Sequence, residues 1–350
     1  MNKATRDTRI DVLRFLAIIL ILLGHSSPPT LLGNLRTFDV SLMVFVMGMS
    51  YSYSREKGVD KYGSYVIKRL SRLLIPTWNF LVIFYLFFFV STFITRITYP
   101  FSVETMISSF QLESGFGFVW IFRVFIVISL FFPISYIILS KVKYLSIQLT
   151  LLTFLLLFQQ SVIRFQQFFP ESISPHYHNF IVIPFGYLIV AAFGMLAVKL
   201  RREQLFWVFE LYVVIFLISA FYQNFEWVNK FKYPPNVYYL SYGLLCSFLL
   251  LFLLTSKFTA IFRQNDIVKW FSTHSLDLYY WHLIIEFILR IFFRNWLPSW
   301  PLKFTLLLIG SFILTVLNSK LAPRLLSTNY LLLLLRKLGV FTKKADLVRK

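Results

Sequence analysis

Ten apolar segments, each about 20 residues long, run through the 350-residue chain. A helix needs about 20 mainly apolar residues to cross the hydrocarbon core of a bilayer. The segments lie near residues 13–30, 38–54, 74–95, 117–139, 146–163, 179–198, 205–222, 236–255, 270–293 and 302–319. They leave short connections and little room for a soluble domain. The pattern therefore predicts an all-α fold, a polytopic membrane bundle of about ten transmembrane helices.

The composition excludes an ordinary soluble protein. Apolar residues make up 58% of the chain and charged residues 14%, whereas soluble domains contain about 45–50% and about 25%. The 42 phenylalanines and 19 tyrosines are more than one water-soluble core can bury. The single cysteine, Cys246, excludes both a disulfide framework and a CxxC motif.

The positive charge follows the expected topology of the spans. Of the 35 Lys and Arg residues, 25 fall in segments on the side of the N-terminus, 7 fall in the opposite loops and 3 lie within spans. Basic residues collect in cytoplasmic loops of membrane proteins. Both termini are therefore predicted to be cytoplasmic, and the net charge of +20 does not require a nucleic-acid partner.

The chain is expected to have two parts. Residues 1–325 contain the ten spans, and residues 326–350 form a basic tail. The tail region has five consecutive leucines, Leu331 to Leu335, followed by basic residues. It is too short to span again, so it is expected to lie along the anionic inner surface of the membrane, in contact with lipid.

Two ionisable residues lie on one stripe of the first span. Arg14 and His25 are eleven residues apart, which corresponds to three helical turns plus about 20° and about 16 Å along the axis. Arg14 is then near the cytoplasmic side and His25 in the outer half. An ionisable group inside a membrane is a functional candidate by default; the alternative is a structural hydrogen bond between helices.

Basic residues also precede the third span. Arg69 and Arg72 are three residues apart and share one helical face beside Lys68. Two guanidinium groups at the cytoplasmic entrance suit the phosphates of a nucleotide-like donor. Their spacing fits equally well with anchoring to lipid headgroups under the positive-inside rule.

Glu113 lies in the loop before the fourth span, which is expected to face outside. It is either a group that orients a base or binds sugar, or a solvated loop acid. The nearby Gly115-Phe116-Gly117 lacks the rest of a phosphate-loop motif.

The ninth span carries a polar stripe formed by Ser275, His282, Glu286 and Arg290, at spacings of 7, 4 and 4 residues. Glu286 and Arg290 can neutralise each other within the membrane. That pairing favours a supporting role for Ser275 and His282, with His282 as a packing residue rather than the catalytic base.

No metal site is expected. His176 and His178 are two residues apart in an outer loop and have no evident third ligand. The sequence also has neither a GxSxG nucleophile elbow nor an HExxH motif.

Five segments, in this order, resemble motifs of acyltransferase family 3, the ten-helix bacterial membrane O-acyltransferases. They are Arg9–Ala17 with Gly24 and His25 (an Arg-x10-His signature), Phe38–Gly48, Lys68–Pro76 (Arg-x-x-Arg), Val119–Phe122 and Ser275–His282. In the second of these, Met47 replaces the usual serine. The resemblance extends from about residue 9 to 320 and is similar to the stand-alone members of the family.

The resemblance implies transfer of an acyl group, usually acetyl from acetyl-CoA, to a hydroxyl of a surface carbohydrate or lipid-linked oligosaccharide, in the bacterial inner membrane. Acetyl-CoA is then a co-substrate, and no tightly bound cofactor is expected. Arg69 and Arg72 would hold the CoA phosphates and Arg14 would guide the donor into the bundle. His25 would act either as general base or through a transient acyl-imidazole.

Other function classes share the same composition. A transporter or flippase of lipid-linked sugars is the main alternative, but such proteins often have internal repeats and broken helices, which the sequence does not clearly show. A polysaccharide polymerase is a third class, and those tend to have a large outer loop.

The topology can be tested with single cysteines. In a Cys246→Ala background, the single cysteines of Ser114→Cys and Ser256→Cys are expected to react from opposite sides of the membrane. The loop with Ser256 is one of the basic loops predicted to be cytoplasmic, and the loop with Ser114 is one of the loops predicted to face outside. A membrane-impermeant maleimide applied to sealed cells should label the first and not the second. Labelling of both from outside would contradict the ten-span topology.

Overall fold

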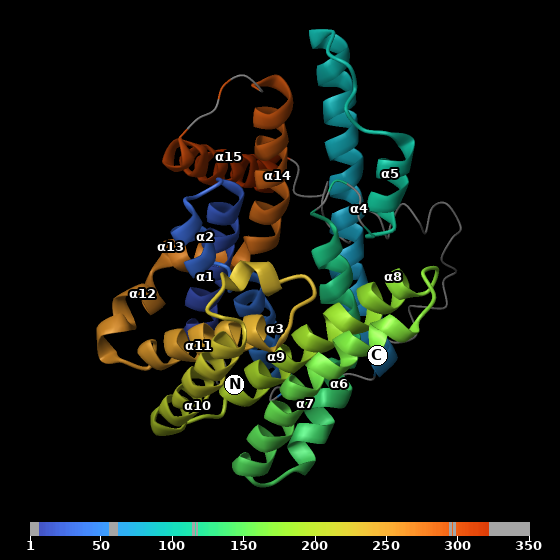
Figure 1. The fold of residues 1–350 in the computed structure, drawn as a ribbon. Helices are drawn as coiled ribbons and strands as arrows, with labels where there is room; N and C mark the ends of the chain where they lie inside the picture. The colour runs from blue at the N-terminus through green and yellow to red at the C-terminus, as the bar shows by residue number, and fades with distance from the viewer. Residues whose placement is uncertain are drawn as a thin grey trace. The chain divides into compact units, whose positions relative to one another are not determined.

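The computed structural model describes residues 7–55, 62–113, 116, 118–293, 296 and 299–321, and this part of the chain contains helices but no β-strand (Figure 1). The chain divides into two compact units, one of Met1–Val59 and Val127–Ser311 and one of Asp60–Ile126 and Phe312–Lys350. The predicted all-α class is confirmed. The tail expected at residues 326–350 lies outside the described residues, as do Ser114, Gly115 and Gly117.

The first unit contains most of the helices. They are α1 (Thr8–His25), α2 (Thr30–Leu35), α3 (Asp39–Arg55), α7 (Leu145–Phe165), α8 (Ser174–Tyr177), α9 (Ile183–Ala197), α10 (Arg202–Tyr222), α11 (Val237–Leu253), α12 (Ala260–Gln264), α13 (Asp266–Thr273) and α14 (Ser275–Phe292). The second unit contains α4 (Tyr62–Thr95) and α5 (Val103–Phe110). The helices α6 (Trp120–Lys141) and α15 (Trp300–Leu321) belong partly to each.

Among the described residues, seven helical segments are long and apolar enough to cross a membrane. They are Thr30–Arg55, Tyr62–Thr95, Trp120–Lys141, Leu145–Phe168, Ser174–Ala197, Arg202–Tyr222 and Trp300–Lys320. The other three expected spans fall on α1, α11 and α14. The helix α11 has 17 residues, and α1 and α14 carry more charge than an ordinary span. The protein is therefore a multi-pass membrane protein, while the count of ten stays a prediction.

Two expected spans differ from the observed helices. The first was expected to continue to residue 30, but α1 ends at His25 because Ser27 has a positive φ of 59° and prolines follow at Pro28 and Pro29. The ninth was expected over 270–293, but the chain leaves helical geometry at His274, which separates α13 from α14. In both places a helix end replaces an expected continuous span.

The core of the first unit depends on a close approach between α3 and α9, which are packed side by side. A Cβ atom at Gly48 of α3 would lie 1.9 Å from the carbonyl oxygen of Ala191, and one at Gly194 of α9 would lie 2.0 Å from that of Phe45. Such small residues let helix backbones meet where lipid provides no hydrophobic driving force.

The second unit is built on α4, against which α5 packs. The hydroxyl of Tyr85 on α4 lies 2.6 Å from the Ser109 hydroxyl on α5, and the Trp78 indole donates to the Phe110 carbonyl at 3.0 Å. Phe84 of α4 stacks on Phe116 with ring centroids 4.6 Å apart. These hydrogen bonds and the ring contact hold α5 and Phe116 on α4.

The α3–α9 contact predicts an asymmetric response to adding a methyl group. Gly194→Ala is expected to destabilise the protein by about 1–3 kcal/mol, because the new Cβ meets backbone that has no free rotation. The matched control is Gly33→Ala in α2, where the nearest atom to a Cβ is 3.9 Å away. Thermal unfolding in detergent should show a lower midpoint for Gly194→Ala alone. Equal midpoints for the two variants would mean that the close approach is absent.

Candidate active site

His25 and His282 face each other in the first unit. His25 is the last residue of α1 and His282 lies in the middle of α14, two helices that are in contact. Their ring centroids are 4.9 Å apart with an angle of 59° between the planes. The structure therefore brings together two histidines that the sequence assigned to separate stripes.

His282 is fully buried. Its ring lies edge-on to Tyr279, with centroids 5.1 Å apart. The carbonyls of Leu278 and Tyr279 are close enough to interact electrostatically with the ring, but within the described residues neither ring nitrogen makes a hydrogen bond of ordinary geometry. A buried polar group without such a bond costs about 1–3 kcal/mol, and most buried polar groups in folded proteins are hydrogen-bonded.

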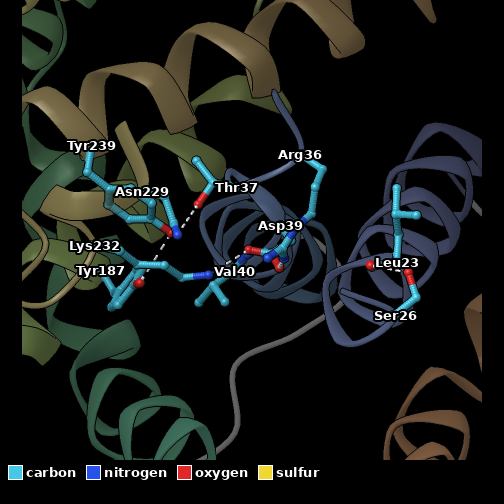
Figure 2. A network of polar contacts seen from close by, with 10 residues as sticks. All are labelled: Leu23, Ser26, Arg36, Thr37, Asp39, Val40, Tyr187, Asn229, Lys232 and Tyr239. Atoms are coloured by element: carbon cyan, nitrogen blue, oxygen red, sulfur yellow. Dashed lines mark hydrogen bonds and ion pairs between the residues drawn. The ribbon is translucent and has the colours of Figure 1, made fainter. Parts of the chain in front are cut away.

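The end of α1 fixes the position of His25. The Ser26 backbone N–H and hydroxyl both donate to the Leu23 carbonyl, at 3.2 Å and 2.7 Å (Figure 2). The chain then turns away at Ser27. His25 consequently lies at the tip of a helix rather than within one, where a side chain can meet groups from several elements.

Arg36 packs directly on the backbone next to His25. A Cβ atom at Gly24 would lie 2.2 Å from Nη1 of Arg36, so the glycine leaves the space that the guanidinium group occupies. Arg36 forms an ion pair with Asp39, three residues later at the start of α3. The Arg36 guanidinium is thus held between the tip of α1 and the start of α3.

Asp39 also binds a lysine from a distant loop. Nζ of Lys232, between α10 and α11, lies 3.0 Å from Oδ1 of Asp39, and Figure 2 shows Arg36 and Lys232 meeting at this carboxylate. The exposed side-chain fraction is 4% for Asp39 and 8% for Lys232. Burial by itself would lower the pKa of Lys232, but the Asp39 carboxylate outweighs it and raises that pKa well above its usual range. Lys232 is therefore charged.

Further hydrogen bonds tie the same loop to the α2–α3 connection. The Thr37 hydroxyl donates to Oδ1 of Asn229 at 3.0 Å, and the Asn229 backbone N–H donates to the Asn34 side chain at 3.3 Å. The Lys232 loop is thus part of the site and not a free connection.

Glu286 is the centre of a second ion cluster, one helical turn beyond His282. The expected pairing with Arg290 is present, with Nε 2.7 Å from Oε1. Lys303, at the start of α15, also pairs with Glu286 at 3.1 Å, and its Nζ lies 3.5 Å from the Ser27 hydroxyl. Glu286 itself is fully buried, so both of its cations act in a low-dielectric setting.

Arg14 lies at the other end of α1. Its guanidinium donates to the hydroxyls of Ser50 on α3 at 2.7 Å and of Ser272 on α13 at 3.4 Å. The Ser272 hydroxyl donates in turn to the Asp11 carboxylate at 2.6 Å. Arg14 therefore joins three helices through these hydrogen bonds. The structural role considered for it, a hydrogen bond between helices, is present whether or not Arg14 also contacts a ligand.

Lys68, Arg69, Arg72 and Glu113 belong to the second unit. The basic residues lie on α4 as expected, with Lys68 and Arg72 exposed and Arg69 partly buried. Glu113 is exposed. Its backbone carbonyl accepts a hydrogen bond from buried Arg123 at 3.3 Å.

The remaining candidates do not join the histidine pair. Ser275 is the first residue of α14, about 10 Å along the helix axis from His282. His178 interacts through Nδ1 with the Gln166 side chain at 3.0 Å, and His176 is exposed. Within the described ranges, no group of three or more His, Cys, Asp or Glu residues is arranged to hold a metal ion.

Sequence reasoning missed Arg36, Lys232 and Lys303, which it counted as loop charges of the outer side. The sequence indicated these cations only indirectly, through the acids that they neutralise. Asp39 and Glu286 are acids within apolar segments, and each needs a nearby cation. The sequence identified one such partner, Arg290, because it is four residues from Glu286; the others come from the α2–α3 connection, a distant loop and α15.

Comparison with known proteins adds the family. Searches of the curated proteins and of the solved structures find no significant match. The model of acyltransferase family 3, described as an acyltransferase domain, matches residues 7–319. This range includes α1 with Arg14 and His25, and α14 with His282. Since the match covers most of the chain and the expected motifs lie in helices of the described fold, the protein belongs to acyltransferase family 3.

Proposed function

We propose that the protein transfers an acetyl group from cytosolic acetyl-CoA to a hydroxyl of a surface or lipid-linked polysaccharide in the bacterial inner membrane. Membership of the acyltransferase family supports the reaction class. The observation that carries the proposal is the contact between His25 and His282 at the tip of α1. It places an imidazole among buried ionic side chains, where an acyl-transfer base is needed.

His25 is the proposed catalytic residue. As general base it takes the proton from the acceptor hydroxyl while the oxygen attacks the thioester carbonyl; the C–S bond then breaks and CoA leaves as the thiol after proton uptake. The covalent alternative begins with attack by the imidazole itself on the thioester carbonyl, which breaks the C–S bond and releases CoA, giving an acyl-histidine. The acceptor hydroxyl then takes the acyl group, losing its proton as the acyl–nitrogen bond breaks and the imidazole is regenerated. Both routes need a neutral imidazole at the start.

His282 supports His25 in this proposal. Its ring contacts the His25 ring on one side and Tyr279 on the other, so it restricts the orientations available to the base. Pre-orientation of a reacting group is a large part of enzymatic rate enhancement. Ser275 is farther along α14 and supports only the start of that helix.

The donor is proposed to bind through basic residues of α4. Arg69 and Arg72, with Lys68 beside them, offer charge-assisted hydrogen bonds to the CoA phosphates, and Arg14 would guide the donor into the bundle. The exposure of Lys68 and Arg72 is compatible with this binding and equally with anchoring to lipid headgroups. Glu113 is proposed as a sugar-binding acid of the outer side.

Replacement of His25 tests the catalytic assignment. His25→Gln keeps side-chain hydrogen bonding but removes the base, so acetyl transfer is expected to fall about 10²–10⁴-fold while donor binding persists. The matched control is His176→Gln, which changes an exposed histidine of an outer loop and should leave the rate unchanged. Transfer of label from acetyl-CoA to oligosaccharide by the purified variants gives the rates. If His25→Gln retained more than about a tenth of wild-type transfer, the base would have to be another residue.

A separate measurement tests the donor site. Arg69→Ala and Arg72→Ala are each expected to weaken acetyl-CoA binding by about 1.5–3 kcal/mol, the value of a charge-assisted hydrogen bond. Lysine at either position should restore only part of the acetyl-CoA affinity, because an ammonium group cannot make the bidentate hydrogen bonds of a guanidinium group. Equilibrium binding of labelled acetyl-CoA, with Lys257→Ala as an exposed control, measures the loss. Unchanged affinity in the folded double Ala variant would assign both arginines to membrane anchoring.

A further inference from the structure

Two ion clusters flank His25, and in each of them two cations share one carboxylate. Asp39 is shared by Arg36 and Lys232, and Glu286 is shared by Arg290 and Lys303. For Arg36, Lys232 and Lys303, the described residues supply no other carboxylate in an ion pair. Asp39 therefore leaves one positive charge of Arg36 and Lys232 uncompensated, and Lys303 shares its carboxylate with a second cation.

These cations are largely removed from water. The exposed side-chain fraction is 8% for Lys232, 15% for Arg36 and 16% for Lys303, against 52% for Arg290. Within the part of the chain that the structure describes, Nε of Arg36 is buried and makes no hydrogen bond. A buried charge that is not fully compensated is strongly unfavourable, so the arrangement fits a site that is completed by an anion.

The clusters are placed where an acceptor would react. Arg36 packs on Gly24 and Lys303 contacts Ser27. Gly24 and Ser27 lie on either side of His25 in the sequence. Arg36 and Lys232 are also within electrostatic range of the His25 imidazole. The CoA phosphates are the other anions of the proposed reaction, and the proposed function assigns them to Arg69 and Arg72 of α4.

We infer that Arg36, Lys232 and Lys303 form a binding site for an anionic group, a carboxylate or a phosphate, of the acceptor. The guanidinium fork and the two ammonium groups match the chemistry of either group. This inference rests on the proposed function for assigning the anion to the acceptor. It then restricts the acceptor to an acidic saccharide or to a saccharide attached to a lipid phosphate.

The test is a binding measurement that needs no acetyl-CoA. The purified full-length protein, in nanodiscs of phosphatidylcholine alone, is titrated with trigalacturonic acid, with neutral galactotriose and with farnesyl phosphate. At least one anionic probe should bind about tenfold or more tightly than the neutral sugar, and its affinity should fall as salt is raised. Tight binding of the acid identifies a carboxylate as the natural group; tight binding of farnesyl phosphate alone identifies a phosphate.

Matched variants locate the binding. Arg36→Gln and Lys303→Gln should each weaken the anionic probe about tenfold or more. Lys230→Gln should stay within about twofold of wild type, because Lys230 lies in the same loop as Lys232 but pairs with Glu226 at the exposed surface. If Arg36→Gln does not purify as a folded protein, Lys303→Gln decides.

Two results would overturn the inference: equal affinity for the neutral and both anionic probes, or wild-type affinity in both Arg36→Gln and Lys303→Gln. A protein that binds the anion through these residues yet transfers no acetyl group would support the site and contradict the proposed function instead.

Discussion

The end of the first unit that carries His25 depends on the burial of the Asp39 carboxylate between two cations from different parts of the chain. Arg36 comes from the α2–α3 connection and Lys232 from a loop 193 residues after Asp39. Removing one partner of a buried ion pair typically costs about 3–5 kcal/mol, so this contact fixes the loop on the start of α3. It also holds the Arg36 guanidinium on Gly24, beside His25. The surroundings of the proposed base, His25, therefore depend on the ion pairs that neutralise the Asp39 carboxylate.

The membrane explains why so much polar chemistry is concentrated along α1 and α14. An ionisable side chain within the bilayer costs about 2.5–3.5 kcal/mol on insertion scales, and both helices carry several. The structure meets this cost at separate levels of the bundle: Asp11, Arg14 and Ser272 at one end of α1, and Glu286 with its two cations beyond the histidines. Between these two groups of charges, the ring of His282 contacts the rings of His25 and Tyr279.

Much of this fold could be predicted from local sequence patterns. Hydropathy located the helices, because a span must satisfy its backbone within one apolar segment, and the four-residue spacing of Glu286 and Arg290 predicted their ion pair. Contacts between distant segments could not be predicted in that way. The separation of 257 residues between His25 and His282, and the loop that carries Lys232, give no periodic signal. The helix ends at His25 and His274 were also missed, although the polar stretches Ser26–Pro29 and Ser272–Ser275 form helix poorly. The spacing of Arg14 and His25 did predict their shared helix, but not that Arg14 would bind Ser50 and Ser272.

The central claim is that a histidine at the tip of α1 supports acyl transfer rather than the passage of a sugar through the bundle. The most direct test follows the wild-type protein in sealed proteoliposomes, with radiolabelled acetyl-CoA on the cytoplasmic side and oligosaccharide acceptor on the other. The account predicts ester-linked label on the oligosaccharide together with an equal amount of free CoA. Movement of a lipid-linked sugar across the membrane, with no label on it and no CoA released, would contradict the account and identify a transporter.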